Sequence, residues 1–292
     1  MILGRLALAA LLLSATTSGG AADPARGQYL AEAAGCGRCH TDAAPGAPPY
    51  AGGRVLDTEF GRLTTPNITP DRATGIGGWS AADFIRAMRW GIAPDDSHYL
   101  PVFPFPYYNR LTDQDLADLK AFLDSLPPVP RPESAGSGPM ALWQRARAAV
   151  AVAATSMPGS WKDDPARDPV WNRGAYLVAT IGRCGQCHTS TTWLGAPDPH
   201  RSLAGAPARS PNDRKAPNIT SDREAGIGNW STDDIVTVLT NGTTPDFDEV
   251  GGSMAEIVKN TATLSEADRR AIAVYLQSVP PVPVSMSGAK PK

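Results

Sequence analysis

Cysteine and histidine are scarce in this chain, which has four of each among 292 residues. All four cysteines fall within residues 36–40 and 184–188, so none is left to form a structural disulfide or to bind a further metal. An excess of one charge is also missing, because 27 Lys and Arg residues stand against 29 Asp and Glu residues. A chain with this balance is not expected to bind nucleic acid.

Long hydrophobic runs are the third absence. The apolar run at residues 6–13 follows Arg5 and leads into small residues that end at Ala22, which is typical of a secretory signal peptide. We expect residues 1–22 to be removed on export to the periplasm. A second apolar stretch, within residues 139–157, is too short to cross a bilayer, so the sequence predicts no transmembrane anchor. Peripheral association with a membrane stays open.

One five-residue pattern occurs twice, as C-G-R-C-H at 36–40 and as C-G-Q-C-H at 184–188. C-x-x-C-H is the attachment signature of c-type haem, because two thiols three positions apart reach both vinyl groups of one porphyrin and the histidine faces the iron. A zinc site would need its two C-x-x-C pairs close in sequence, and here they lie 148 positions apart (184 minus 36). A thioredoxin-like motif would not explain the histidines. The sequence therefore predicts two covalently bound haem c groups, held by Cys36, Cys39 and His40 and by Cys184, Cys187 and His188.

The segments around the two motifs also recur. R-G-Q-Y-L at 26–30 returns as R-G-A-Y-L at 173–177, and P-N-I-T at 66–69 returns at 217–220, an offset of 151 (217 minus 66). Such a repeat indicates two copies of one haem domain. The expected organisation is a first domain at 23–128, a Pro-rich linker and connecting helix at 129–165, a second domain at 166–283 and a short tail at 284–292.

Helix signals recur in each copy. A first helix is expected at 26–34, where Gly27 would let another helix approach closely. The patterns Ser80-x-x-Asp83 and Ser231-x-x-Asp234 predict the start of a middle helix. Thr112 and Ser265 open a last helix, which Pro-Pro pairs stop at 127–128 and 280–281. No segment requires a sheet, so the expected fold class is all-α.

With these motifs the chain resembles the two-domain dihaem c-type cytochromes with class I-like domains. It is similar to the cytochrome subunits of periplasmic alcohol, gluconate and fructose dehydrogenases. The resemblance implies a tandem pair of cytochrome c domains, and it departs in two respects, since those subunits often carry three haems and a C-terminal membrane attachment. The residues that carry it are the two C-x-x-C-H motifs, the P-N-I-T...G-I-G-x-W-S blocks at 66–80 and 217–231, F-P-F-P-Y-Y at 103–108, W-N-R-G-A-Y-L at 171–177, and Met254.

The sixth iron ligand decides between electron transfer and small-molecule chemistry. His40 and His188 are the expected proximal ligands. For the second haem the resemblance points to Met254, which follows two glycines and a serine in a predicted loop ahead of the last helix. A methionine that merely packs in the core is the alternative reading.

The first haem differs, because shifting Met254 back by 151 positions leads to Phe103, which cannot bind iron. His98, five residues earlier, is the nearest side chain that can bind iron, and we expect it to be the distal ligand. Met88 is a competitor, although its counterpart Leu239 suggests a residue of a helix core. An open or water-bound iron is the third alternative.

Three other features have simple readings. Trp79 and Trp230 precede the middle helices and are expected to pack in the haem pockets rather than to contact a substrate. His200 lies in a Pro-rich loop and is expected to be exposed. The two P-N-I-T loops are expected to shape the haem edge through backbone hydrogen bonds.

Two classes of function follow from these expectations. In the first, the chain is a periplasmic electron-transfer protein between a dehydrogenase and an accepting cytochrome or oxidase. In the second, it is a dihaem enzyme. A thiosulfate-oxidising enzyme of the familiar dihaem kind is excluded because no cysteine is spare as a distal ligand, which leaves a peroxidase-like reaction at an open first haem.

Overall fold

The computed structural model describes residues 20–58, 60–131, 159–193, 196–208 and 215–283. Most of the predicted signal peptide, the predicted connecting helix at 139–157 and the tail at 284–292 lie outside the described residues. No helix in the described part of the chain is both long and apolar enough to cross a membrane.

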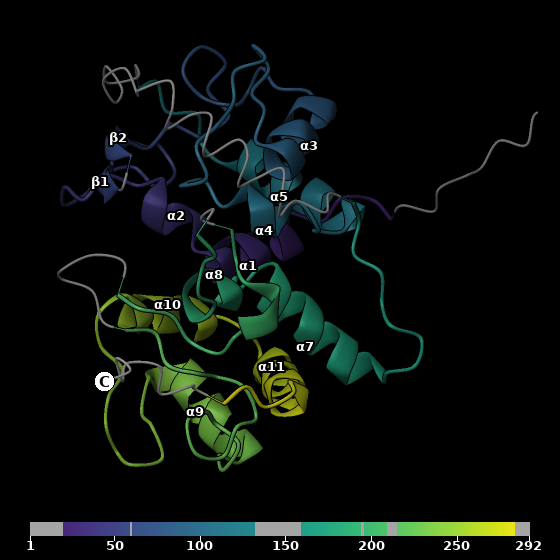
Figure 1. Cartoon of the computed structure of the whole chain (residues 1–292). Helices are drawn as coiled ribbons and strands as arrows, with labels where there is room; N and C mark the ends of the chain where they lie inside the picture. Colours follow the sequence, from purple (N-terminus) through teal and green to yellow (C-terminus); the bar gives the residue numbers. More distant parts are fainter. Residues whose placement is uncertain (1–19, 59, 132–158, 194–195, 209–214, 284–292) are drawn as a thin grey trace, which may run out of the picture.

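The described α-helices form two groups that follow the same order, with a β-hairpin added in the first group and a 3-10 helix in the second (Figure 1). In the N-terminal half, residues 20–131, they are α1 (Pro24–Ala34), α2 (Cys36–Cys39), β1 (Val55–Thr58), β2 (Gly61–Thr64), α3 (Ala81–Trp90), α4 (Phe105–Tyr108) and α5 (Asp113–Ser125). In the C-terminal half, residues 159–283, they are α7 (Pro169–Ala179), α8 (Cys184–His188), η1 (Pro199–Arg201), α9 (Thr232–Asn241), α10 (Ser253–Thr261) and α11 (Glu266–Ser278).

The predicted helix starts are confirmed. Ser80 and Ser231 each form a reciprocal capping box, in which the serine accepts from the backbone of the aspartate three positions later and that aspartate accepts from the serine backbone. Thr112 and Ser265 cap α5 and α11 in the simpler way, through one bond to a backbone N–H. Local sequence therefore places these helices.

Two features were not predicted. Residues 55–64 form an antiparallel hairpin, in which Val55 pairs with Thr64 and Thr58 with Gly61, so the fold is mostly but not entirely α. The short helices α4 and α10 precede the last helix of each half. The residues before the last helix were expected to be loop, so the loop prediction around Met254 was wrong: Gly252 ends the loop and Met254 lies in the first turn of α10.

In each half the first and last helices cross at a glycine. A Cβ at Gly27 would overlap the backbone carbonyl of Asp118 in α5, and a Cβ at Gly174 would overlap that of Ala271 in α11. Around these crossings lies a core of buried aliphatic and aromatic side chains, among them Leu30, Leu116, Leu177 and Ile272. The close helix contact predicted at Gly27 is confirmed.

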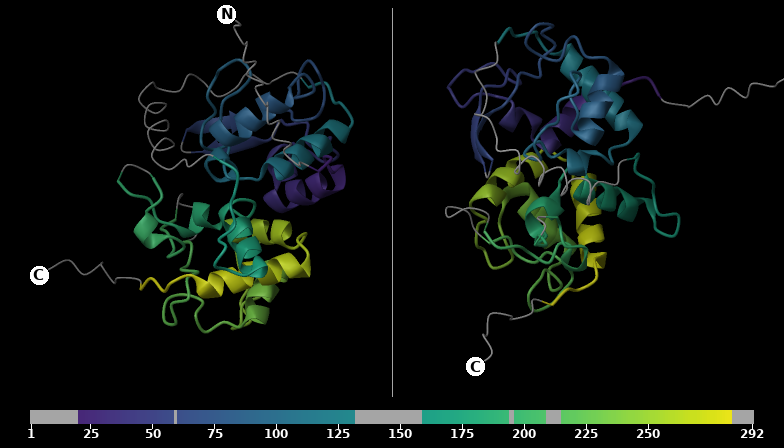
Figure 2. Two further views of the ribbon diagram at one scale, coloured as in Figure 1. Left: turned by 90° about the vertical axis from the view of Figure 1, so that its right-hand side faces the viewer. Right: turned by 45° about the horizontal axis from the view of Figure 1, so that its top comes forward.

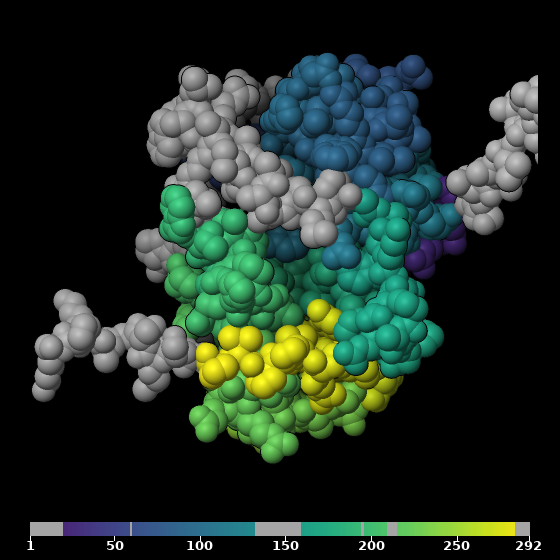
Figure 3. All heavy atoms as spheres, turned by 45° about the vertical axis from the view of Figure 1, so that its right-hand side comes forward, coloured from purple at the N-terminus to yellow at the C-terminus, as the bar shows by residue number. Residues whose placement is uncertain are grey.

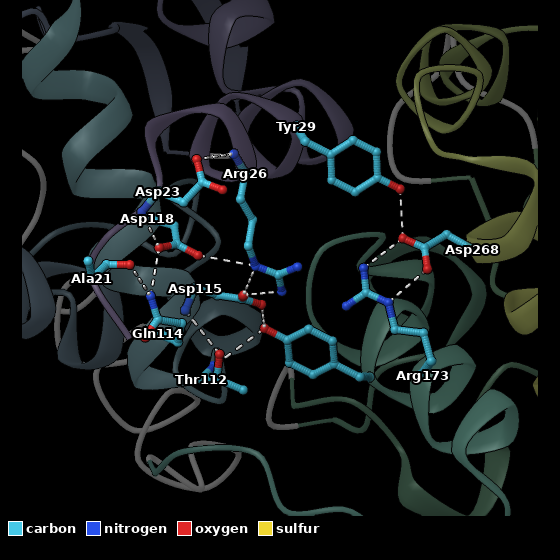
Figure 4. Close-up of polar contacts among 11 residues, drawn as sticks. Ala21, Asp23, Arg26, Tyr29, Thr112, Gln114, Asp115, Asp118, Arg173 and Asp268 are labelled. Atoms are coloured by element: carbon cyan, nitrogen blue, oxygen red, sulfur yellow. Dashed lines mark hydrogen bonds and ion pairs between the residues drawn. The ribbon is translucent and has the colours of Figure 1, made fainter. Parts of the chain in front are cut away.

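The two halves lie against each other through a reciprocal set of contacts (Figures 2 and 4). Asp115 accepts from Arg26 of its own half, with 2.5 Å between Nη2 and Oδ1, and from the hydroxyl of Tyr176 in the other half. Asp268 accepts from Arg173 of its own half at 2.6 Å and from the hydroxyl of Tyr29 at 2.6 Å.

A chain segment also joins the halves. Residues 159–168 begin against the N-terminal half, where the backbone of Trp161 donates to the carbonyl of Arg110, and they end at α7 (Figure 3). The Trp161 ring lies between the guanidinium of Arg110, 4.2 Å away, and the ring of Tyr176, 5.6 Å away.

Candidate haem sites

The two C-x-x-C-H motifs occupy equivalent places. The four residues after the turn at Gly35 form the short helix α2, and the five residues after Arg183 form α8, so each short helix carries both cysteines of its motif. Cys36 and Cys184 pack against the core, and burial raises the pKa of their thiols to about 11 and about 12. None of the four cysteines forms a disulfide, so both sulfurs of each motif are available to form thioethers.

The histidine of each motif is held by one hydrogen bond. Nδ1 of His40 lies 2.9 Å from the carbonyl oxygen of Pro66, and Nδ1 of His188 lies 2.8 Å from that of Pro217. Because a carbonyl only accepts, Nδ1 carries the proton and Nε2 keeps its lone pair. Burial lowers the pKa of both rings, more than the carbonyl contact raises it, and so favours the neutral form that binds a metal.

Asparagine side chains hold the P-N-I-T loops in shape. Oδ1 of Asn67 accepts from both the backbone and the hydroxyl of Thr69, at 2.9 and 2.7 Å, and Nδ2 donates to the carbonyl of Val129 at 2.7 Å. Asn218 makes the same bonds to Thr220 and to the backbone after α11. The sequence pointed to these loops, but only the structure assigns their proline carbonyls to the histidines.

These donor sets fit covalent haem. Each motif offers two thiols three positions apart and one neutral imidazole whose Nε2 is free to bind iron, with the backbone carbonyl that typically orients such a ligand. The residues that would hold the two groups are the six that the motif predicts. Within the described ranges no cluster of three or more His, Cys, Asp and Glu side chains has the form of a bare metal site.

Met254 and its counterpart Phe103 have different surroundings. Met254 is partly buried at the start of α10, which packs against α9. Phe103 belongs to an aromatic group, with its ring centroid 5.6 Å from Tyr99, 6.4 Å from Phe105 and 6.0 Å from Tyr108. The structure therefore keeps a thioether at this place in the C-terminal half and a hydrocarbon ring in the N-terminal half.

The two other candidate ligands of the first haem, His98 and Met88, differ in their exposure to solvent. His98 is exposed and its backbone bridges to Ile92, in the turn that follows α3. Met88 is 8% exposed and belongs to the core face of α3. Glu249, which bridges to Thr243, takes the place of His98 in the other half.

Three other residues were considered from the sequence, and of these only His200 was expected to be exposed. Trp79 and Trp230 are partly buried and packed against the core beside the capping serines. His200 is exposed in η1. Neither tryptophan nor this histidine is joined to a C-x-x-C-H motif by a hydrogen bond among the described residues.

Arginines in the first motif and directly before the second contact the opposite half, which sequence reasoning missed. Arg38 of the first motif pairs with Glu256 at 3.0 Å and also reaches Asn260, both in α10. Arg183, directly before the second motif, donates from Nη2 to the carbonyl of Ala34 at 3.0 Å. Its guanidinium carbon lies 5.4 Å from the ring centroid of Tyr108 in α4.

Comparison with known proteins shows which family the chain belongs to. The family model described as cytochrome c matches residues 24–127. A protein of Cereibacter sphaeroides named "Diheme cytochrome c-type" is 43% identical over 266 residues, which cover 89% of this chain and 87% of that protein. The "Fructose dehydrogenase cytochrome subunit" of Gluconobacter japonicus is 38% identical, with 87% of this chain and 52% of that protein covered. The "Gluconate 2-dehydrogenase cytochrome c subunit" of Pantoea cypripedii is 36% identical, with 96% and 64% covered.

The chain thus spans nearly the full length of one relative and between half and two thirds of the other two. The resemblance to cytochrome subunits is confirmed, and covalently bound haem c follows from it. This chain belongs to the c-type cytochromes, in a group that includes a dihaem cytochrome and the cytochrome subunits of dehydrogenases.

Proposed function

We propose that this chain is a periplasmic dihaem cytochrome that carries electrons from a dehydrogenase to a downstream cytochrome or terminal oxidase. The observation that carries the proposal is the pair of neutral imidazoles, one in each C-x-x-C-H motif, each oriented by a proline carbonyl. The names of the dehydrogenase cytochrome subunits among the relatives support a dehydrogenase as the partner. Export by a signal peptide at 1–22 belongs to the proposal.

Each half is proposed to be one cytochrome c domain, at 23–128 and 166–283, that holds one haem. The haem supplies one-electron redox chemistry, and the chain fixes its axial ligands and surroundings. Cys36 and Cys39, like Cys184 and Cys187, would form the thioethers. His40 and His188 are the proposed proximal ligands, and Met254 is the proposed distal ligand of the second haem.

For the first haem we propose His98 as the distal ligand, since it is the only other histidine between residues 23 and 128. Thioether ligation favours ferrous iron more than a second imidazole does. The haem bound at His188 would then have the higher reduction potential, and one electron would pass from the ferrous first haem to the ferric second haem.

A second candidate function rests on the exposure of His98 and on Phe103 at the place of Met254. If His98 does not bind, the first iron has an open position at which peroxide could be reduced. Two reduced haems would then supply the two electrons that convert hydrogen peroxide into two water molecules, with two protons from solvent.

One experiment separates the two functions. The mass of the purified protein is first measured by mass spectrometry, and we expect it to exceed the mass of the polypeptide alone by two haems. It is then reduced and mixed either with an oxidised small c-type cytochrome or with hydrogen peroxide, and the haem absorbance is followed. Fast oxidation by the cytochrome and no turnover of peroxide are expected. A mass increase of one haem, or sustained peroxide turnover with a reduced cytochrome as donor, would overturn the proposal.

A further inference from the structure

We infer that Arg183 is a fixed positive charge at the boundary of the two haem sites, and that it raises the reduction potential of the haem bound at Cys36 and Cys39 from the opposite half. The inference rests on the proposed function, because it requires a haem in each half. It assigns a tuning role to a residue that lies outside both C-x-x-C-H motifs.

The backbone at Arg183 is unusual. Its φ is 49°, in the left-handed region where a residue with a Cβ is disfavoured. The equivalent position before the first motif is Gly35, with φ 71°. The chain therefore has glycine, the residue that this conformation favours, before the first motif and arginine before the second. An arginine keeps a left-handed conformation only where contacts of its side chain and backbone hold it there.

The side chain crosses to the N-terminal half. Nη2 donates to the carbonyl of Ala34, the last residue of α1 and two positions before Cys36. The carbonyls at a helix C-terminus carry partial negative charge and so attract a cation. The ring of Tyr108 forms the other contact, at 5.4 Å from the guanidinium carbon.

Within the described part of the chain, no carboxylate pairs with the guanidinium of Arg183. None of the ion pairs between described residues includes Arg183, and its Nε is buried without a hydrogen-bond partner. Its strongest electrostatic neighbours are Tyr108, Cys36, Cys39 and Cys187. Burial raises the pKa of Tyr108, so that phenol is neutral, and cysteine sulfurs bonded to haem are neutral thioethers.

Arg38 provides a contrast within the same chain. It also lies at a motif and crosses to the opposite half, but its side chain is 35% exposed and pairs with Glu256 at 3.0 Å. Its charge is therefore balanced by a carboxylate and screened by water. Arg38 is a matched control for a substitution at Arg183.

The effect on the haem follows from Coulomb's law. Ferric haem carries one more positive charge than ferrous haem, so a nearby fixed cation destabilises the ferric form and raises the potential. Both direct contacts of the Arg183 side chain, Ala34 and Tyr108, belong to the N-terminal half. The first haem should therefore feel the charge more than the second. Because Arg183 is partly buried and its Nε is shielded from solvent, salt should screen its charge little.

The test is a redox titration of the dihaem protein and of Arg183→Gln, Arg183→Lys and Arg38→Gln. The wave that moves in Met254→Ala is assigned to the second haem, and the other wave to the first. We expect Arg183→Gln to lower the potential of the first haem clearly and that of the second haem less, equally at low and high ionic strength. Arg183→Lys should stay close to wild type, and Arg38→Gln should move either wave much less.

Several outcomes would overturn the inference. These are an unchanged first wave in Arg183→Gln, an equal shift in Arg38→Gln, or a shift of the same size in Arg183→Lys, which keeps the charge. If Arg183→Gln does not yield protein with two haems, Arg183→Lys decides, since a lowered first wave in it excludes charge as the cause. Failure of the proposed function is recognised separately, by a single covalent haem in the wild-type protein.

Discussion

At the residue scale, the histidine of each C-x-x-C-H motif depends on one hydrogen bond to a backbone carbonyl. The carbonyls of Pro66 and Pro217 orient the rings of His40 and His188. Asn67 and Asn218 are 5% exposed and use both ends of their amide groups to hold these loops. The Nε2 atom of each ring is thus positioned by a hydrogen-bonded loop, 26 residues further along the chain for His40 and 29 for His188.

The distal ligands lead to a prediction with an internal control. Met254→Ala should leave both haems attached but remove the sulfur-to-iron charge-transfer band from the absorption spectrum of the oxidised protein. Met88→Ala should keep that band and lower the free energy of unfolding by about 2–4 kcal/mol, because Met88 is buried in the core. If the band survives Met254→Ala and disappears in Met88→Ala, Met88 is the iron ligand and Met254 is not.

At the scale of elements, the crossing of the first and last helices depends on a missing side chain. Gly27 in α1 touches the backbone of α5, and Gly174 in α7 touches that of α11. Backbone atoms cannot move aside as a flexible side chain can, so an added methyl group must push the helices apart.

We therefore expect Gly27→Ala and Gly174→Ala each to lower the free energy of unfolding by about 2–3 kcal/mol. This loss would occur although alanine is the better helix former by about 1 kcal/mol. Gly78→Ala is the control, since a Cβ there meets nothing closer than 3.7 Å, and it should change stability by less than about 0.5 kcal/mol. Urea denaturation measures all three, and a neutral Gly27→Ala would contradict the close packing.

At the scale of the whole molecule, two aspartates join the halves. Each is the third residue of the last helix in one half and accepts from an arginine of that half and from a tyrosine of the other (Figure 4). Burial alone would raise the pKa of Asp268, but hydrogen bonds from Arg173 and Tyr29 outweigh burial and hold it below its usual value.

A lowered carboxyl pKa stabilises the folded state above the pKa of the unfolded chain, near 4, and this contribution disappears as the pH falls through the folded-state pKa. Asp268→Asn should therefore lower the free energy of unfolding by about 2–3 kcal/mol at pH 7, where the carboxylate binds Arg173. The stabilities of wild type and variant should converge as the pH is lowered below about 4.

Circular dichroism during urea denaturation at several pH values provides the measurement. Asp233→Asn is a suitable control, because Asp233 also pairs with an arginine but its side chain is 77% exposed. We expect this control to change little at any pH. A constant difference between wild type and Asp268→Asn across the whole pH range would exclude the proposed linkage.

Much of this protein could be predicted from the sequence because the signals are local. The spacing within C-x-x-C-H is set by the porphyrin, and the caps at Ser80 and Ser231 act within a single helical turn. The hairpin at 55–64 was missed because its strands have four residues each, and neither V-L-D-T nor G-R-L-T alternates apolar with polar residues. The helix α10 was missed because the glycines before Met254 were taken for a continuing loop.

Only the tertiary structure decided how the two sites relate. The sequence determined that there are two motifs and which six side chains they supply. It carried no sign that Arg183 would reach Ala34, 149 positions earlier, or that Tyr29 would bond Asp268, 239 positions later. Contacts of this kind form when two folded surfaces meet, and their energy depends on burial and geometry that no local pattern records. The pairing of the halves, and with it the charge between the haem sites, therefore belongs to the folded molecule.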